Sequence, residues 1–218
     1  MKKIILLFSL LTATIGMTAQ TIVEDIEGRP TDYVNSIRGR ARKIIDKLGI
    51  DDTTKANMAT IVLTNRYFKL NDIYAERDTL IARAKRTLKG SEKNKAIQEA
   101  NNQCESRLYK SHFEFPATLS LFLTPEQVDG VKDGMTFNVV KVTYDAHIEM
   151  IPSLTDEEKQ QIMAWLIEAR EFAIDAESSK KKHEWFGKYK GRINNYLSKR
   201  GYDLTKEREE WYKRIGKK

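Results

Sequence analysis

Apolar residues recur every three or four positions from Thr31 to Phe115, and this spacing is the feature that most restricts the fold. It places the apolar side chains on one face of a helix and is incompatible with the alternation of a strand. The first run ends at Gly49, and a second, capped by Asp51, Asp52 or Thr53, continues to Gly90. A third run ends near Pro116, because the residue before a proline resists helical geometry. Two long helices joined at one glycine predict an antiparallel hairpin.

The second half of the chain contains a repeated helix-start pattern, Leu-Thr-x-Glu, beginning at Leu123, Leu154 and Leu204. The threonine oxygen can accept a hydrogen bond from a free backbone amide, and the acidic residue lies in the positive first turn. We interpret these segments as helix starts. An alternative is a resemblance to periplasmic chaperones of the Leu-Thr-x-x-Gln type, which are curved helical hairpins. Only Leu123 to Gln127 matches that motif fully.

The fold class predicted from these patterns is all-α, with about six or seven helices. Residues 20–218 are expected to form a single domain, in which an N-terminal hairpin, about 31–122, packs on a C-terminal helical bundle, about 123–215. Residues 137–144 are β-branched and aromatic, so we predict one short extended segment there. With only one such segment, no sheet is expected.

Residues 1–19 have the pattern of a secretory signal peptide. Lys2 and Lys3 precede an apolar run that is too short to span a bilayer, and Ala19 is a small residue at the expected cleavage position. No cysteine follows the run, so a lipid anchor is not predicted. We therefore expect a periplasmic or secreted protein without stable membrane insertion.

The charge of the exported protein points to acidic partners other than nucleic acid. The formal charge is +7, of which Lys2 and Lys3 contribute two, so +5 remains after cleavage. Export removes the protein from nucleic acids and favours anionic glycans, lipopolysaccharide or a membrane surface as partners. Cys104 is the single cysteine, which excludes an intramolecular disulfide.

No catalytic, metal or cofactor site is predicted from local motifs. His112, His147 and His183 are too far apart in sequence for a local zinc site, and Cys104 lies on the apolar stripe of its helix, as a buried, inert thiol would. Glu168, Glu171 and Asp175 share a helix face and could supply an acid and a base, although surface ion pairing is the simpler interpretation. An unrecognised hydrolase or lyase would need a pocket that joins two carboxylates, or a tyrosine and an arginine.

The segment His183 to Asp203 is the most distinctive part of the sequence. Phe186, Tyr189, Ile193 and Leu197 form its predicted buried stripe, and Gly187 and Gly191 would allow close approach of another helix. Aromatic rings, cations and amides beside this stripe are the groups that bind an anionic sugar, although a structural tryptophan on a solvated cationic face is the alternative interpretation. The candidate carbohydrate-binding residues are Trp185, Lys188, Tyr189, Arg192, Asn195 and Tyr196, with Lys199 at the same helical spacing.

This segment, together with Met135 to Tyr144 and Met150 to Lys159, resembles a family of secreted proteins of unknown function from glycan-degrading Gram-negative bacteria. Its genes often lie beside those of polysaccharide-degrading enzymes, and the family has been considered sugar-binding. The resemblance implies a non-enzymatic accessory protein that binds an acidic oligosaccharide or polysaccharide. The alternative function is a chaperone-like or adaptor protein that meets a protein partner through the N-terminal hairpin.

Overall fold

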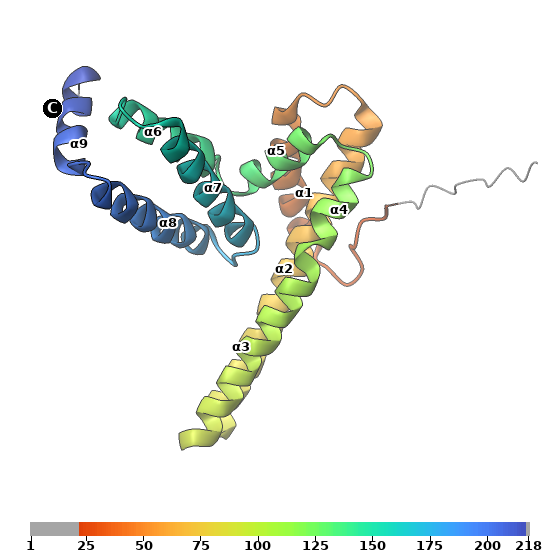
Figure 1. The fold of residues 1–218 in the computed structure, drawn as a ribbon. Helices are drawn as coiled ribbons and strands as arrows, with labels where there is room; N and C mark the ends of the chain where they lie inside the picture. Colours follow the sequence, from red (N-terminus) through yellow and green to blue (C-terminus); the bar gives the residue numbers. More distant parts are fainter. Residues whose placement is uncertain (1–21, 217–218) are drawn as a thin grey trace, which may run out of the picture.

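A computed structural model describes residues 22–216, within which all regular structure is helical (Figure 1). The predicted signal peptide, residues 1–19, lies outside the described residues. The N-terminal helices are α1 (Thr31–Ile45), a 3₁₀ turn (Asp46–Leu48), α2 (Thr53–Thr87), α3 (Gly90–His112) and α4 (Glu114–Ser120). The C-terminal helices are α5 (Pro125–Met135), α6 (Val139–Met150), α7 (Asp156–Ala173), α8 (Ser179–Lys199) and α9 (Leu204–Arg214). The predicted all-α class is confirmed.

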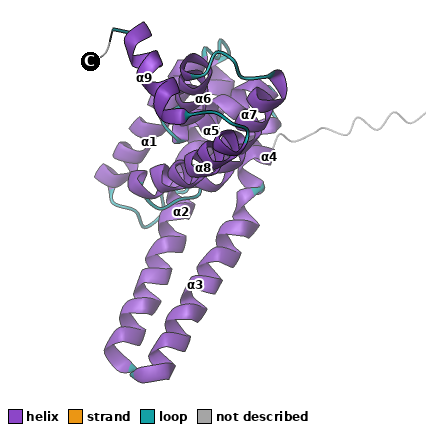
Figure 2. Ribbon diagram, turned by 60° about the vertical axis from the view of Figure 1, so that its left-hand side comes forward, coloured by secondary structure: helices purple, strands orange, loops and turns teal. Residues whose placement is uncertain are grey.

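Helices α2 and α3 form the predicted antiparallel hairpin, whose outer end projects away from the other helices as an arm (Figure 2). Asp52 caps α2 by accepting hydrogen bonds from the amides of Thr54 and Lys55. The connection bends at Gly90, whose φ of 56° lies in the left-handed region that favours glycine. Because α2 has 35 residues, this helix is about 50 Å long, and only its outer part belongs to the arm.

Two large apolar cores hold the body of the protein together, and a smaller cluster of Val34, Ile37 and Phe68 joins α1 to α2. The first lies among α1, α2, α4 and α5, and its fully buried members include Leu63, Leu119 and Val131. The second lies mainly among α6, α7 and α8, and it contains Phe186, Tyr189, Ile193 and Leu197, so the stripe predicted for α8 is confirmed. None of the helices between residues 22 and 216 combines the length and apolar character that a bilayer crossing requires.

The prediction of an extended segment at residues 137–144 is wrong. Phe137 and Asn138 adopt left-handed φ values of 60° and 56°, and α6 begins directly after them. Val140, Thr143 and His147 are the buried residues of α6, and they recur at helical spacing. Packing of this face against α7 therefore overrides the local preference of β-branched residues for strands.

More helices form than the six or seven expected, partly because the chain turns at Phe113 and separates α4 from α3. Pro116 was expected to end the third helix. Instead it lies in the first turn of α4, where the missing amide hydrogen costs no hydrogen bond.

The predicted close approach at Gly187 and Gly191 is also wrong, since no heavy atom lies within 4 Å of a Cβ built at either position. Close helix packing occurs instead at Gly130 and Gly134 of α5. A Cβ at Gly130 would lie 2.7 Å from Cδ2 of Leu48, and one at Gly134 would overlap the side chain of Ile44.

Two of the three Leu-Thr patterns are helix starts of the expected kind. Thr124 and Thr155 each cap a helix in a reciprocal capping box, with Gln127 and Glu158 respectively. The third differs, because Asp203 caps α9 and Thr205 lies inside its first turn. The third pattern therefore owes its helix start to the aspartate that precedes it.

Candidate functional site

The outer surface of α7 and α8 carries a groove of about 590 Å³ that contains much of the predicted carbohydrate-binding set. Four of the six predicted residues line it, namely Lys188, Arg192, Asn195 and Tyr196. The remaining lining residues are Trp165, Gly191 and Lys199. The helical spacing of α8 therefore does bring these donors to one place.

Trp165 of α7 is a groove residue that the sequence analysis did not single out. Its ring meets Tyr196 edge to face, with the centroids 5.1 Å apart. The guanidinium carbon of Arg192 lies 4.5 Å from the Trp165 centroid, while Nη1 of Arg192 lies 3.2 Å from Oε2 of Glu168. The groove thus presents a planar cation stacked on an aromatic ring and oriented by one carboxylate.

The other two predicted residues lie outside the groove. Tyr189 is buried in the second core. Trp185 stacks on Phe172 at a centroid distance of 4.6 Å, and Nζ of Lys188 lies 4.2 Å from its ring centroid. Trp185 instead lines a neighbouring cleft, while Lys188 lines the groove, so the two surfaces adjoin along α8.

This cleft, of about 810 Å³, lies between the hairpin and the C-terminal helices α7 and α8. Glu168, Glu171 and Asp175, the trio that the sequence placed on one helix face, all line it, and Tyr74 and Arg77 of α2 contribute from the hairpin. It therefore joins carboxylates with a tyrosine and an arginine, as an unrecognised active site would require. Cys104 also lines the cleft, and burial raises the pKa of its thiol, which favours the unreactive protonated form.

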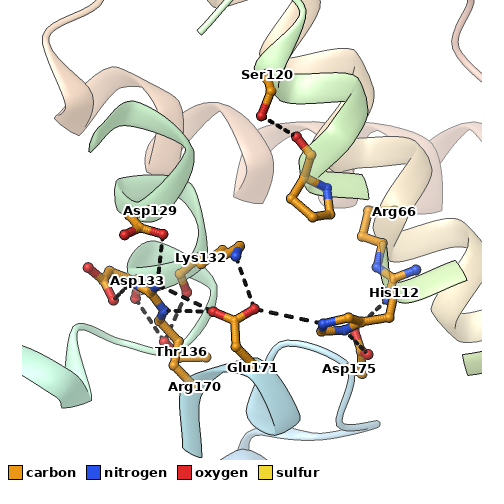
Figure 3. Close-up of polar contacts among 11 residues, drawn as sticks. Arg66, His112, Ser120, Asp129, Lys132, Asp133, Thr136, Arg170, Glu171 and Asp175 are labelled. Atoms are coloured by element: carbon orange, nitrogen blue, oxygen red, sulfur yellow. Dashed lines mark hydrogen bonds and ion pairs between the residues drawn. The ribbon is translucent and has the colours of Figure 1, made fainter. Parts of the chain in front are cut away.

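Asp175 is the centre of the polar network behind this cleft (Figure 3). Its Oδ2 lies 2.8 Å from Nδ1 of His112, and its Oδ1 pairs with the guanidinium of Arg66, which is 3% exposed. The hydroxyl of Tyr74 donates to the Asp175 carbonyl oxygen at 2.8 Å. Three hairpin side chains thus hold the segment that follows α7.

Glu171 is held in a second set of ion pairs beside the first (Figure 3). Lys132 donates to its Oε2 at 3.0 Å, and Oε1 accepts from Arg170, which also pairs with Asp129 and Asp133. Nε2 of His112 lies 3.8 Å from Oε2 of Glu171, beyond hydrogen-bond distance. Glu171 and Asp175 are therefore both paired with cationic side chains.

The remaining histidines lie elsewhere. His147 contacts the carbonyl oxygen of Thr143 inside α6, and His183 stacks on Phe137. Within residues 22–216, no cluster of three or more His, Cys, Asp or Glu side chains has the geometry of a metal site.

No curated protein matches this chain. The sequence pattern of one family, described as protein of unknown function (DUF3826), matches residues 34–217, which covers α2 to α9 and most of α1. The chain therefore belongs to the DUF3826 family.

Proposed function

We propose that this protein is an exported, non-enzymatic accessory protein of polysaccharide utilisation, and that it binds an acidic carbohydrate in the groove of α7 and α8. The observation that carries the proposal is the combination of groups in one groove. Trp165 and Tyr196 offer aromatic surface, Asn195 offers an amide, and Lys188, Arg192 and Lys199 are cations.

Each of these groups matches one part of an acidic sugar. A pyranose ring can stack on the aromatic surface, and hydroxyl groups can bond to the amide of Asn195. The guanidinium of Arg192 has donors in addition to the one that faces Glu168, and a uronate carboxylate can accept from them. Lys188 and Lys199 add attraction that salt will weaken.

Isothermal titration of the mature protein with oligogalacturonides tests the proposal. Lys199→Ala and Asn195→Ala are expected to weaken binding about tenfold, which corresponds to ~1.4 kcal/mol. Lys190→Ala is the matched control, because Lys190 is an exposed lysine of the same helix that does not line the groove. No heat at millimolar ligand, or equal losses in Lys199→Ala and Lys190→Ala, would contradict groove binding.

A protein partner at the arm is a second proposal, consistent with a chaperone-like or adaptor function. The arm projects away from the other helices (Figure 2). Its outer end, near Gly90, carries exposed cations, among them Arg83, Arg86 and Lys89. Suppression of aggregation of an unfolded exported protein should then depend on these charges. If Arg83→Glu/Arg86→Glu suppresses aggregation as well as the parent protein, the arm is not the contact surface.

A further inference from the structure

Exposed aromatic side chains gather at the cleft between the hairpin and α7 and α8. Tyr109, Phe113 and Phe172 are 70%, 59% and 46% exposed, and all three line this cleft. Large apolar rings that are exposed together have an unfavourable free energy of hydration. Such a patch on a folded protein commonly marks a binding surface. Concave aromatic surfaces of this size are typical of ligand sites.

The rings come from both sides of the cleft. Tyr109 and Phe113, at the end of the hairpin, meet edge to face with centroids 5.5 Å apart. Phe172 and Trp185, from α7 and α8, are stacked. A flat ligand can therefore contact aromatic surface of both the hairpin and the C-terminal helices.

Between these rings, His112 offers an oriented polar group. Contact with Asp175 fixes the orientation of the ring through Nδ1. Nε2 has no partner within hydrogen-bond distance among the described residues, since Oε2 of Glu171 is 3.8 Å away. A ligand hydroxyl that reaches His112 can form a hydrogen bond with Nε2.

The charges of the cleft differ from those of the groove. Its lining contains five carboxylates and two side chains that are always cationic, Arg77 and Lys181. Both cations are already paired, Arg77 with Asp78 and Glu177, and Lys181 with Glu184. The lining therefore offers an anionic sugar no unpaired arginine or lysine, whereas the carboxylate oxygens can accept hydrogen bonds from uncharged hydroxyl groups.

We propose that this cleft is a second binding site, which takes an uncharged sugar ring between the Tyr109–Phe113 pair and the Phe172–Trp185 pair. The site adjoins the groove, because Lys188 of the groove lies over the ring of Trp185. An uncharged unit of a glycan occupies the cleft, and this binding does not require an acidic unit in the groove.

Titration of the mature protein with neutral oligosaccharides tests this site, using cellopentaose, xylopentaose and galactopentaose as probes. We expect at least one to bind at millimolar concentration and to quench tryptophan fluorescence, because Trp185 lines the cleft. Tyr109→Ala should weaken that binding about fivefold, since one stacking contact is lost. Tyr109 is largely exposed, so this change leaves the cores intact.

Two controls separate this site from the groove. Tyr212→Ala removes another exposed tyrosine, on α9, and should leave the affinity unchanged, as should Lys199→Ala in the groove. The proposal is overturned if none of the three probes binds, or if Tyr109→Ala leaves the binding unaltered. Binding of tetramethylammonium with no binding of the sugars would also overturn it and assign the cleft to a cation. Loss of oligogalacturonide binding alone leaves this site supported and removes only the groove.

Discussion

Nδ1 of His112 and Oδ2 of Asp175 lie 2.8 Å apart, although the two residues are 63 positions apart in the sequence. The contact joins the end of α3 to the segment that follows α7. Because Arg66 and Tyr74 of α2 hold the same aspartate, both helices of the hairpin are tied to one short segment. These contacts fix the hairpin against the segment that lines one side of the cleft.

Arg66→Met should destabilise the protein by about 3 kcal/mol. The change leaves the largely buried Asp175 without its guanidinium partner, and breaking a buried ion pair from one side usually costs this much. Urea unfolding followed by circular dichroism measures the difference. Lys141→Met breaks the exposed pair with Asp145 and should leave the stability almost unchanged, because solvent screens such pairs. Equal losses of unfolding free energy in the two variants would show that the buried ion pair stabilises the fold no more than the exposed pair does.

Lys182→Met should stabilise the protein at pH 7, by about 1 kcal/mol. Burial lowers the pKa of Lys182 from 10.5 to about 8, even though Asp175 lies nearby. The unfolded chain therefore binds this proton more tightly than the folded one, and folding carries a penalty below pH 8 that disappears as the pH rises to about 10.5. The variant removes the penalty but also the hydrogen bond to the carbonyl oxygen of Met135.

Unfolding free energies measured at pH 7 and pH 10.5 test this behaviour. The advantage of Lys182→Met should largely vanish at the higher pH, where the lysine is neutral in the folded state and about half protonated in the unfolded state. Lys180→Met, at an exposed position of the same helix, is the control and should show no such pH dependence. An advantage that persists at pH 10.5 would mean that packing, and not charge, is responsible.

Glu158→Gln should remove part of the acid sensitivity of the fold. Burial opposes ionisation of Glu158, but hydrogen bonds from the Thr155 backbone, Tyr202 and Arg200 lower its pKa to about 2. The resulting stability is fully present above the unfolded pKa of about 4.5 and is lost as the pH falls towards 2. We expect a difference of about 2 kcal/mol between parent and variant at pH 7, and almost none at pH 2.

Acid unfolding monitored by tryptophan fluorescence detects this difference. Glu157→Gln serves as the control. The side chain of Glu157 is largely exposed, and its Oε1 lies 3.8 Å from Nη1 of Arg200. If Glu157→Gln and Glu158→Gln flatten the acid transition equally, the buried network does not cause it.

Gly134→Ala should destabilise the protein by about 2 kcal/mol, because the added methyl group overlaps Ile44 and forces α5 away from α1. Gly187→Ala places the same methyl group in open space on α8 and should stabilise that helix by up to about 1 kcal/mol. Thermal unfolding of the two variants gives the comparison. If Gly187→Ala destabilises the protein, another helix must lie close to Gly187, as the sequence predicted.

The proposed export predicts a mature N-terminus at Gln20. Mass spectrometry of the protein from a periplasmic fraction should show the loss of residues 1–19. Ala19→Arg should block cleavage, whereas a change at Thr21, beyond the cleavage position, should not. Finding the uncleaved protein in the cytoplasm would remove the basis for a glycan partner.

The helices were predictable because their signals are local. Periodic apolar residues, Gly90 at the hairpin bend and the capping threonines 124 and 155 act within a few residues of the structure they specify. The segment after Phe137 was not predictable in the same way. Its β-branched residues favour a strand locally, and only packing against α7 makes them helical.

The two candidate surfaces differ for the same reason. Six of the seven residues that line the groove lie on α8, so their helical spacing was sufficient to group them. The cleft depends on contacts such as that between Arg66 and Asp175, which are 109 positions apart. The sequence around Arg66 does not indicate that Asp175 will be its partner, and the reverse is also true. The aromatic pairs on the two sides of the cleft therefore could not be grouped from the sequence.

The arm of α2 and α3 makes its own contacts beyond the cleft, and its outer end touches no other helix (Figure 2). Adding or removing seven residues in each helix would shift the tip by about 10 Å while keeping the apolar seam in register. The length of the arm can therefore vary between relatives without disturbing either surface at its base, and it can act as a spacer that sets how far the body stands from whatever the tip meets.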